Sequence, residues 1–327
     1  MLKVAICGAG GLGRSHAMNF AQVPDAKVTL IFDVIPEAAQ ALAEKVGARP
    51  TANEADLWAD DIDAVVITTP TAFHADYAIK AARAGKHVFC EKPMCREMAQ
   101  GEEMLQAVAD SGVTFMVGQV VRFFPPYARA HDLIQSGAIG DVGVAHTSRV
   151  STMPGGAGGW FRDFRLSGGV TLDMTVHDFD WLLWTFGPAK RVYAVGAPGR
   201  MPALDYGLTT IRFESGVIAH CEGSWADLGR FRTSFDIAGS GGLLRHDSEQ
   251  MATLTVQRRG AEKGLPDVQV PQSPAPRSPY LIEDEHFVHC ALAGEQPAIT
   301  GEEALAAVEV ALAAIESIEA GGRVIEL

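Results

Sequence analysis

The sequence lacks an excess of positive charge. It has 27 lysines and arginines against 40 aspartates and glutamates in 327 residues, a formal net charge of −13. No cluster of basic residues with interleaved aromatic residues offsets this balance. The charge disfavours nucleic acid and an anionic membrane surface as the main partner.

Cysteines and long apolar runs are also scarce. The five cysteines are an odd number without CxxC spacing, which predicts free thiols in a reducing compartment. No 18-residue apolar run and no signal-type segment precedes the first strand. We therefore expect a cytoplasmic protein with no membrane partner.

Metal-binding motifs are absent as well. The sequence has no HExxH and no Cys/His cluster that would complete a first shell of ligands, so we expect no metal. Its length favours two domains, because single cores stop growing at roughly 250–300 residues.

The first 122 residues alternate apolar runs of strand length with helical stretches, which predicts a doubly wound parallel sheet, a Rossmann domain. The expected strands are Val4–Cys7, Val28–Phe32, Ala64–Ile67, His87–Cys90 and Val113–Val117. The expected helices are Pro36–Val46, Phe73–Ala84 and Glu97–Ala109.

Residues 123–327 follow a different pattern, with alternating segments separated by hairpin-type turns, so we expect a second α/β domain with a large, mostly antiparallel open sheet. Its expected strands are Val142–Val150, Arg191–Ala197, Thr209–Phe213, Val217–Cys221, Thr233–Ala238 and Thr253–Gln257. Residues 264–279 are expected to form a proline-rich loop, and helices are expected at Leu281–Leu292 and Glu302–Ala320.

A glycine-rich turn follows the first strand. Gly8, Gly10 and Gly13 have GxGxxG spacing in the segment GAGGLG, which also contains Gly11 and Leu12. Such a turn brings the backbone close to a pyrophosphate at a helix N-terminus. By itself this hexapeptide is a weak signal, but a helix, a strand and an acid follow it in register.

That acid is Asp33, about 20 residues after the glycines, where a carboxylate binds the adenosine ribose diol of NAD. It would repel the 2′-phosphate of NADP, and Val34-Ile35-Pro36 offers no basic residue to bind one. Arg14 keeps NADP open as the less favoured alternative. We expect NAD as the cofactor.

Polar residues follow two of the expected strands. Thr69-Pro70 and Glu91-Lys92-Pro93 come at carboxyl ends of parallel strands, where ligands of open α/β sheets bind. Lys92 would lie beside the nicotinamide and hydrogen-bond a substrate oxygen. The alternative is an exposed lysine paired locally with Glu91.

Asp173 and His177 lie four residues apart in an aromatic-rich segment that ends at Gly187-Pro188. This spacing in a helix places both side chains on one face. The pair could be a core hydrogen bond, two metal ligands with Asp178 or Asp180 nearby, or a base with its partner. The absent metal motifs weaken the second interpretation.

Together these segments resemble the glucose-fructose oxidoreductase/inositol dehydrogenase (Gfo/Idh/MocA) family over nearly the whole chain. GAGGLG, the segment from TTPTAFH to CEKPM, and GGxxxDxxxHDFD match its motifs in order and spacing. The resemblance implies a Rossmann domain and a second domain whose open sheet often forms the oligomer contact. A homodimer or homotetramer is therefore expected.

The resemblance also implies residue roles. Lys92 is similar to the catalytic lysine, Asp173 to the substrate-binding acid and His177 to the proton-transferring histidine of the family. HDFD is most similar to the inositol dehydrogenase branch, which implies a cyclic polyol or sugar as substrate. We assign His177 as the base, with a pKa near neutrality, and Asp173 as the residue that orients it; the alternative base is Lys92.

Further contacts are expected around these residues. The expected substrate-binding residues are Lys92, Arg122, Trp160, Asp173 and His177, and the expected cofactor contacts beyond the glycine loop and Asp33 are Thr69, Pro70, His74, Glu91 and Lys92. His74 could equally serve as a helix cap. The loop MPGGAGGWFRDF (153–164) departs from any substrate-reading pattern of the family.

The expected activity is NAD-dependent oxidation of a secondary hydroxyl. Two alternatives remain open. One is a redox-neutral enzyme that retains NAD and processes sugars, and the other is a non-catalytic regulator that senses NAD or a sugar. A regulator could dispense with Lys92 and His177, and this chain has both.

Overall fold

The computed structural model describes residues 1–198, 204–250, 254–259, 266–269 and 277–327. Within these residues, the N-terminal part of the chain forms a six-stranded parallel sheet in the order β3-β2-β1-β4-β5-β6. The strands are β1 (Leu2–Cys7), β2 (Ala26–Phe32), β3 (Arg49–Thr51), β4 (Ala64–Ile67), β5 (His87–Glu91) and β6 (Phe115–Gly118). The expected doubly wound sheet is confirmed, and its order is that of a Rossmann fold.

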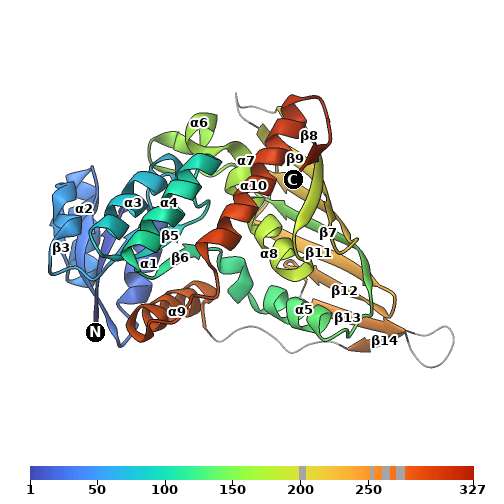
Figure 1. The fold of residues 1–327 in the computed structure, drawn as a ribbon, viewed down its shortest axis with the longest axis horizontal. Coiled ribbons are helices and arrows are strands. Elements are labelled where there is room, and N and C mark those ends of the chain that lie inside the picture. Colours follow the sequence, from blue (N-terminus) through green and yellow to red (C-terminus); the bar gives the residue numbers. More distant parts are fainter. Residues whose placement is uncertain (199–203, 251–253, 260–265, 270–276) are drawn as a thin grey trace.

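Helices cover this sheet and connect its strands (Figure 1). They are α1 (Gly11–Phe20), α2 (Pro36–Val46), α3 (His74–Arg83) and α4 (Met98–Ser111), with 3-10 helices η1 (Glu54–Trp58), η2 (Thr71–Phe73) and η3 (Val120–Phe123). The domain boundary expected after Arg122 falls inside η3 and stays a prediction.

The second sheet has nine strands in the described residues, in the order β14-β13-β12-β11-β7-β10-β9-β8-β15. Among the strand pairs that the structure describes here, only β7–β10 is parallel, so the expected mostly antiparallel sheet is confirmed. The strands are β7 (Val142–Val150), β8 (Ala189–Pro198), β9 (Leu204–Phe213), β10 (Ile218–Ser224), β11 (Arg232–Gly239), β12 (Gly242–Asp247), β13 (Leu254–Arg259), β14 (Pro266–Gln269) and β15 (Ile325–Glu326).

The helices of this part lie on one side of the second sheet, and α8 and α10 stand between the two sheets (Figure 1). They are α5 (Pro125–Gln135), η4 (Ala157–Arg162), α6 (Phe164–Ser167), α7 (Gly169–Asp173), α8 (Val176–Phe186), α9 (Pro279–Ala293) and α10 (Gly301–Glu319). None of the helices in the described ranges is both long enough and apolar enough to span a membrane.

Two sequence-based expectations for this part were wrong in detail. Residues 266–269, inside the expected loop 264–279, form strand β14 and pair with β13. Asp173 and His177 do not share one helix, since α7 ends at Asp173 and α8 begins at Val176. Thr253 of the expected strand Thr253–Gln257 lies outside the described residues.

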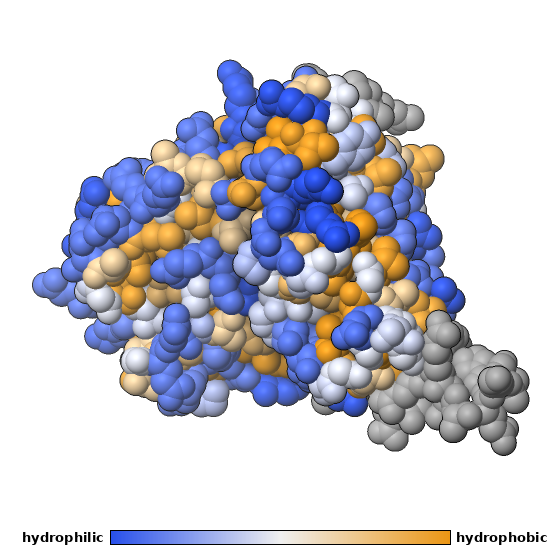
Figure 2. All heavy atoms as spheres, turned by 45° about the vertical axis from the view of Figure 1, so that its right-hand side comes forward, coloured by the Kyte–Doolittle hydropathy of each residue, from blue (hydrophilic) through white to orange (hydrophobic). Residues whose placement is uncertain are grey.

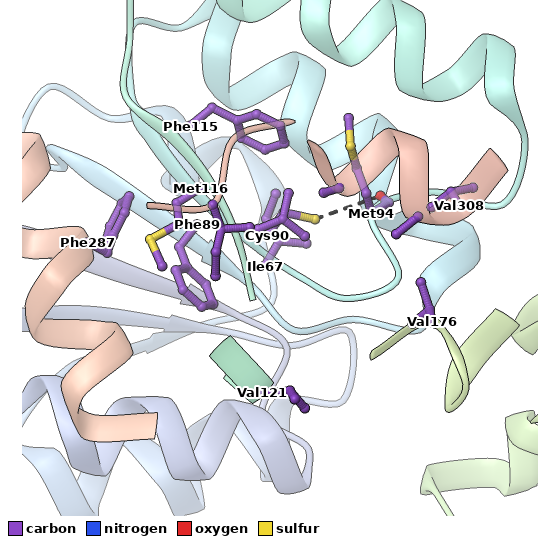
Figure 3. Close-up of a cluster of buried hydrophobic side chains, with 14 of the residues drawn as sticks. Ile67, Phe89, Cys90, Met94, Phe115, Met116, Val121, Val176, Phe287 and Val308 are labelled. Atoms are coloured by element: carbon purple, nitrogen blue, oxygen red, sulfur yellow. Dashed lines mark hydrogen bonds between the residues drawn. The ribbon is translucent and has the colours of Figure 1, made fainter. Parts of the chain in front are cut away.

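One hydrophobic core continues from the Rossmann sheet into the second domain. Cys90 and Met94 are fully buried at its centre, with side chains from β4, β6, α8, α9 and α10 around them (Figure 3). The thiol of Cys90 also contacts the carbonyl oxygen of Met94 at 3.9 Å. The turn that carries Lys92 is therefore anchored by buried residues on both sides.

Candidate active site

The glycine loop has the geometry expected for a dinucleotide. Gly8 has φ +108°, and a Cβ there would lie 3.0 Å from the backbone of Thr68. A Cβ on Gly13 would lie 1.8 Å from the carbonyl oxygen of Gly8. Gly10 and Gly11 face open space, with nothing within 4 Å of a Cβ. Only glycine fits at positions 8 and 13. The open space beside Gly10 and Gly11 leaves room for a pyrophosphate at the N-terminus of α1.

Asp33 closes this loop from the end of β2. One of its carboxylate oxygens accepts a hydrogen bond from the N–H of Ala9 at 2.7 Å, and the other accepts from the N–H of Ile35 at 2.8 Å. Each oxygen keeps a second lone pair for a ribose hydroxyl. The exposed side chains that follow are Val34 and Ile35, which supply no positive charge.

Thr69 and Pro70 lie half-buried after β4, beside the glycine loop. The hydroxyl of Thr69 is buried and has no hydrogen-bond partner among the described residues. An orphaned polar group of this kind is costly unless a ligand satisfies it. With the open glycines and Asp33, these residues fit a dinucleotide.

Lys92 lies at the carboxyl end of β5, where it meets Asp173. Its ammonium donates a hydrogen bond to the backbone oxygen of Asp173 at 2.8 Å, and lies 3.5 Å from the carboxylate. Burial raises the pKa of Asp173, and the positive charge of Lys92 opposes this shift. The two side chains are 13% and 9% exposed, so they form a nearly dry ion pair at the edge of the sheet.

His177 is held by a residue that sequence reasoning missed. Its Nδ1 lies 3.1 Å from Oε1 of Gln119, a fully buried side chain that follows β6. An amide oxygen only accepts, so Nδ1 carries the proton and Nε2 keeps a free lone pair. Burial and the positive charges of Lys92 and Arg149 lower the pKa of His177 well below its ordinary value, contrary to the near-neutral value expected. His177 is therefore a neutral histidine able to accept a proton at Nε2.

The expected bond between Asp173 and His177 is not present in the described structure. Asp173 contacts Lys92, and His177 contacts Gln119. Gln119 could have been found from its position, since it follows an apolar strand at the same sheet edge as Glu91 and Lys92.

The other two acids of the HDFD segment, Asp178 and Asp180, each pair with a buried arginine of the protein. Asp178 receives two hydrogen bonds from Arg149, at 2.7 and 3.3 Å. Asp180 receives two from Arg122, at 2.8 and 2.6 Å. Removing one partner of such a buried pair costs about 3–5 kcal/mol.

Arg122, His74 and Glu91, which were expected to contact substrate or cofactor, all make hydrogen bonds within the protein. Arg122 is buried, and its guanidinium also contacts Glu303 and the carbonyl of Ala298, and a substrate role for it stays a prediction. His74 lies between the carbonyl oxygens of Thr69 and Pro93, 2.8 Å from each. It thus joins the two turns at the sheet edge. Glu91 is buried against His16 and the backbone N–H of Lys92.

Trp160 lies half-buried in η4 and stacks on Phe161, with ring centroids 3.9 Å apart. Phe161 in turn meets Trp225 edge-on. Arg96, shortly after the Lys92 turn, holds the adjoining α6 through the carbonyls of Phe164 and Arg165. A substrate role for Trp160 stays a prediction.

Comparison with known proteins agrees with this geometry. Residues 2–119 match the model of an oxidoreductase family with an NAD-binding Rossmann fold, and residues 127–259 match the GFO/IDH/MocA C-terminal domain. The chain belongs to the GFO/IDH/MocA oxidoreductase family. Its N-terminal domain is accordingly an NAD-binding domain, and the protein is an oxidoreductase.

Individual members of this family match over most of the chain. The chain is 30% identical to scyllo-inositol 2-dehydrogenase (NAD(+)) of Bacillus subtilis strain 168, over 91% of this chain and 89% of that protein. It is 29% identical to levoglucosan dehydrogenase of Pseudarthrobacter phenanthrenivorans, over 79% of this chain and 78% of that protein. The structure of apo scyllo-inositol dehydrogenase from Lactobacillus casei superposes with a TM-score of 0.83 at 27% identity, over 100% and 98%.

Proposed function

We propose that the protein oxidises a secondary hydroxyl of a cyclic polyol or sugar with NAD. The observation that carries the proposal is the meeting of Lys92, Asp173 and a neutral His177 at the carboxyl edge of the Rossmann sheet. Relatives named for an inositol and for levoglucosan support a cyclic, polyhydroxylated substrate.

His177 is assigned as the general base. As the carbinol loses hydride, Nε2 of His177 takes the hydroxyl proton and a carbonyl forms. Bound NAD supplies the hydride acceptor. A positioned base of this kind contributes roughly 10²–10⁴-fold to the rate.

Lys92 donates a hydrogen bond to the same oxygen and stabilises its developing negative charge, while Asp173 binds a neighbouring hydroxyl and balances the charge of Lys92. Because the pair is nearly dry, its electrostatic effect exceeds that of an exposed pair.

Screening the purified protein with NAD against inositols, aldoses, anhydrosugars and uronates tests the proposal through NADH absorbance. Net NADH with at least one cyclic polyol or sugar is expected, and its loss in Lys92→Ala. Product formation without net NADH would indicate a redox-neutral enzyme. Binding of NAD and sugar without turnover of any compound would indicate a regulator.

A further inference from the structure

A cluster of buried ionisable groups lies behind the Lys92 turn, outside the chemistry proposed above. His16 comes from α1, Glu91 from the end of β5 and Asp284 from α9, and their exposures are 0%, 3% and 0%. Nε2 of His16 lies 2.9 Å from Oε1 of Glu91, and Nδ1 lies 2.7 Å from Oδ1 of Asp284. One imidazole thus bridges two carboxylates from distant parts of the chain.

The hydrogen bonds of this cluster are complete. The second oxygen of Glu91 accepts from the backbone N–H of Lys92 at 2.9 Å. The second oxygen of Asp284 accepts from the side-chain amide of Asn19 at 2.9 Å. With an ionised carboxylate on each side, both ring nitrogens of His16 donate, and the ring is an imidazolium.

The electrostatics of His16 and Glu91 agree with this protonation, whereas burial raises the pKa of Asp284 and the charge and hydrogen bond of His16 oppose that shift. Burial opposes a charge on His16, but the charges and hydrogen bonds of Asp284 and Glu91 raise its pKa well above the ordinary value. Burial likewise opposes the charge on Glu91, and the hydrogen bond from His16 lowers the pKa of that carboxyl. An ionised Glu91 is the stronger acceptor for the N–H of Lys92.

We propose that His16 is a positioning residue for the catalytic lysine, acting through Glu91. By fixing the carboxylate on the N–H of Lys92, it sets where the turn leaves β5 and therefore where the ammonium lies. This inference rests on the proposed function of Lys92. Since His16 sits in the helix that begins at the glycine loop, the same contact fixes the lysine relative to the cofactor site.

A purely stabilising role explains the cluster poorly. The ring of His16 packs against Phe89 at 5.0 Å between centroids, in a setting where apolar residues would fill the space. Replacing a buried ionic cluster by apolar residues is often neutral or stabilising. Glu283, next to Asp284, is also fully buried, and neither of its carboxyl oxygens has a partner within the described structure. Polar groups retained at such a cost are expected where function needs them.

A double-mutant cycle tests the proposal. His16→Gln keeps one amide donor but loses the bridge, and should lower kcat on the best substrate by roughly 10- to 100-fold, the scale of a small misplacement of a catalytic group. In a Lys92→Ala background, His16→Gln should lower kcat no further, because the ammonium that His16 positions is absent. His289→Gln, on the exposed face of α9, is the matched control and should keep full activity.

If His16→Gln lowers kcat equally in the native and the Lys92→Ala backgrounds, or does not lower it in the native background, the positioning role is overturned. If His16→Gln does not fold by circular dichroism, Asp284→Asn goes through the same cycle, with a smaller loss expected that again requires Lys92. Wild-type activity in Lys92→Ala alone would instead overturn the proposed function, and with it the reason for positioning.

Discussion

At the scale of residues, the proposed mechanism assigns proton acceptance and charge stabilisation to two different side chains. His177 is neutral because burial and nearby cations disfavour its charged form, whereas Lys92 keeps an acidic partner in Asp173. The hydrogen bond to Gln119 occupies Nδ1 of His177 and leaves Nε2, on the other side of the ring, as the nitrogen that can accept a proton.

Gln119 gives the first prediction. Gln119→Met keeps the length but loses the acceptor for Nδ1–H, so kcat should fall by roughly tenfold or more as the tautomer is no longer fixed. Gln119→Glu places a negative charge at Nδ1 and should raise the pKa of His177, moving the acidic limb of kcat/KM to higher pH. If kcat and the pH dependence of kcat/KM are unchanged in both variants, Gln119 does not act in the mechanism.

Asp33 gives a prediction on cofactor choice. Each charge-assisted hydrogen bond to the ribose diol is worth about 1.5–3 kcal/mol, so Asp33→Ser should narrow the preference for NAD over NADP by roughly 10- to 100-fold. Glu44→Gln, an exposed acid on α2, is the control and should leave the ratio of kcat/KM values unchanged. Equal use of both cofactors by the native protein would contradict the assignment.

At the scale of elements, sequence patterns predicted those parts of the fold that local chemistry determines. Pro36–Val46 was predicted with its observed bounds because a proline begins α2 and Gly47 ends it in the left-handed conformation. Lys92 and Glu91 were placed at the correct sheet edge because parallel strands bring their carboxyl ends together.

The break between α7 and α8 could not be predicted in this way. Both the N–H and the hydroxyl of Thr175 bond to the carbonyl of Val170, which ends the first helix. Gly223 of β10 packs directly against Thr175, a contact that only the folded chain creates. The position of Gln119 after β6 marks the right sheet edge, but its pairing with His177, 58 residues later in the chain, is visible only in the folded structure.

The loop Met153–Trp160 gives a prediction at this scale. Gly156, Gly158 and Gly159 have positive φ, and the loop joins β7 to the segment that Arg96 anchors beside the Lys92 turn. We expect it to close over bound substrate, as glycine-rich lids do. Hydrogen exchange of residues 153–160 should slow when NAD and substrate are added together, with α2 as the unaffected reference. Unchanged exchange would contradict a lid.

At the scale of the whole molecule, one face of the second sheet is left open. No helix of the described residues covers it, and it contains a hollow of about 650 Å³ lined by residues that include His146, His220, Glu222 and Asp236. Tyr193, Val195 and Leu208 are exposed on the same sheet. Hydrophobic and hydrophilic residues are interspersed on the side of the molecule that Figure 2 shows.

We predict that this open sheet mediates a homodimer or homotetramer. Val217, just before β10, and Ala219 are buried, whereas Ile218 between them is half-buried, so this segment has apolar residues on both faces of the sheet. Leu208→Glu should shift the assembly towards monomer, while Glu316→Gln on the opposite, helical side should not. A monomer for the native protein by light scattering at micromolar concentration would contradict the prediction.

The pH dependence of kcat/KM for the native protein and His177→Ala, on the best polyol or sugar, tests the central claim most directly. A lowered pKa keeps His177 neutral to lower pH, so the native acidic limb should lie below the ordinary histidine value of about 6.5. His177→Ala should lose that limb and roughly 10²–10⁴-fold in kcat while still binding NAD. If His177→Ala keeps the acidic limb or wild-type kcat, His177 is not the base.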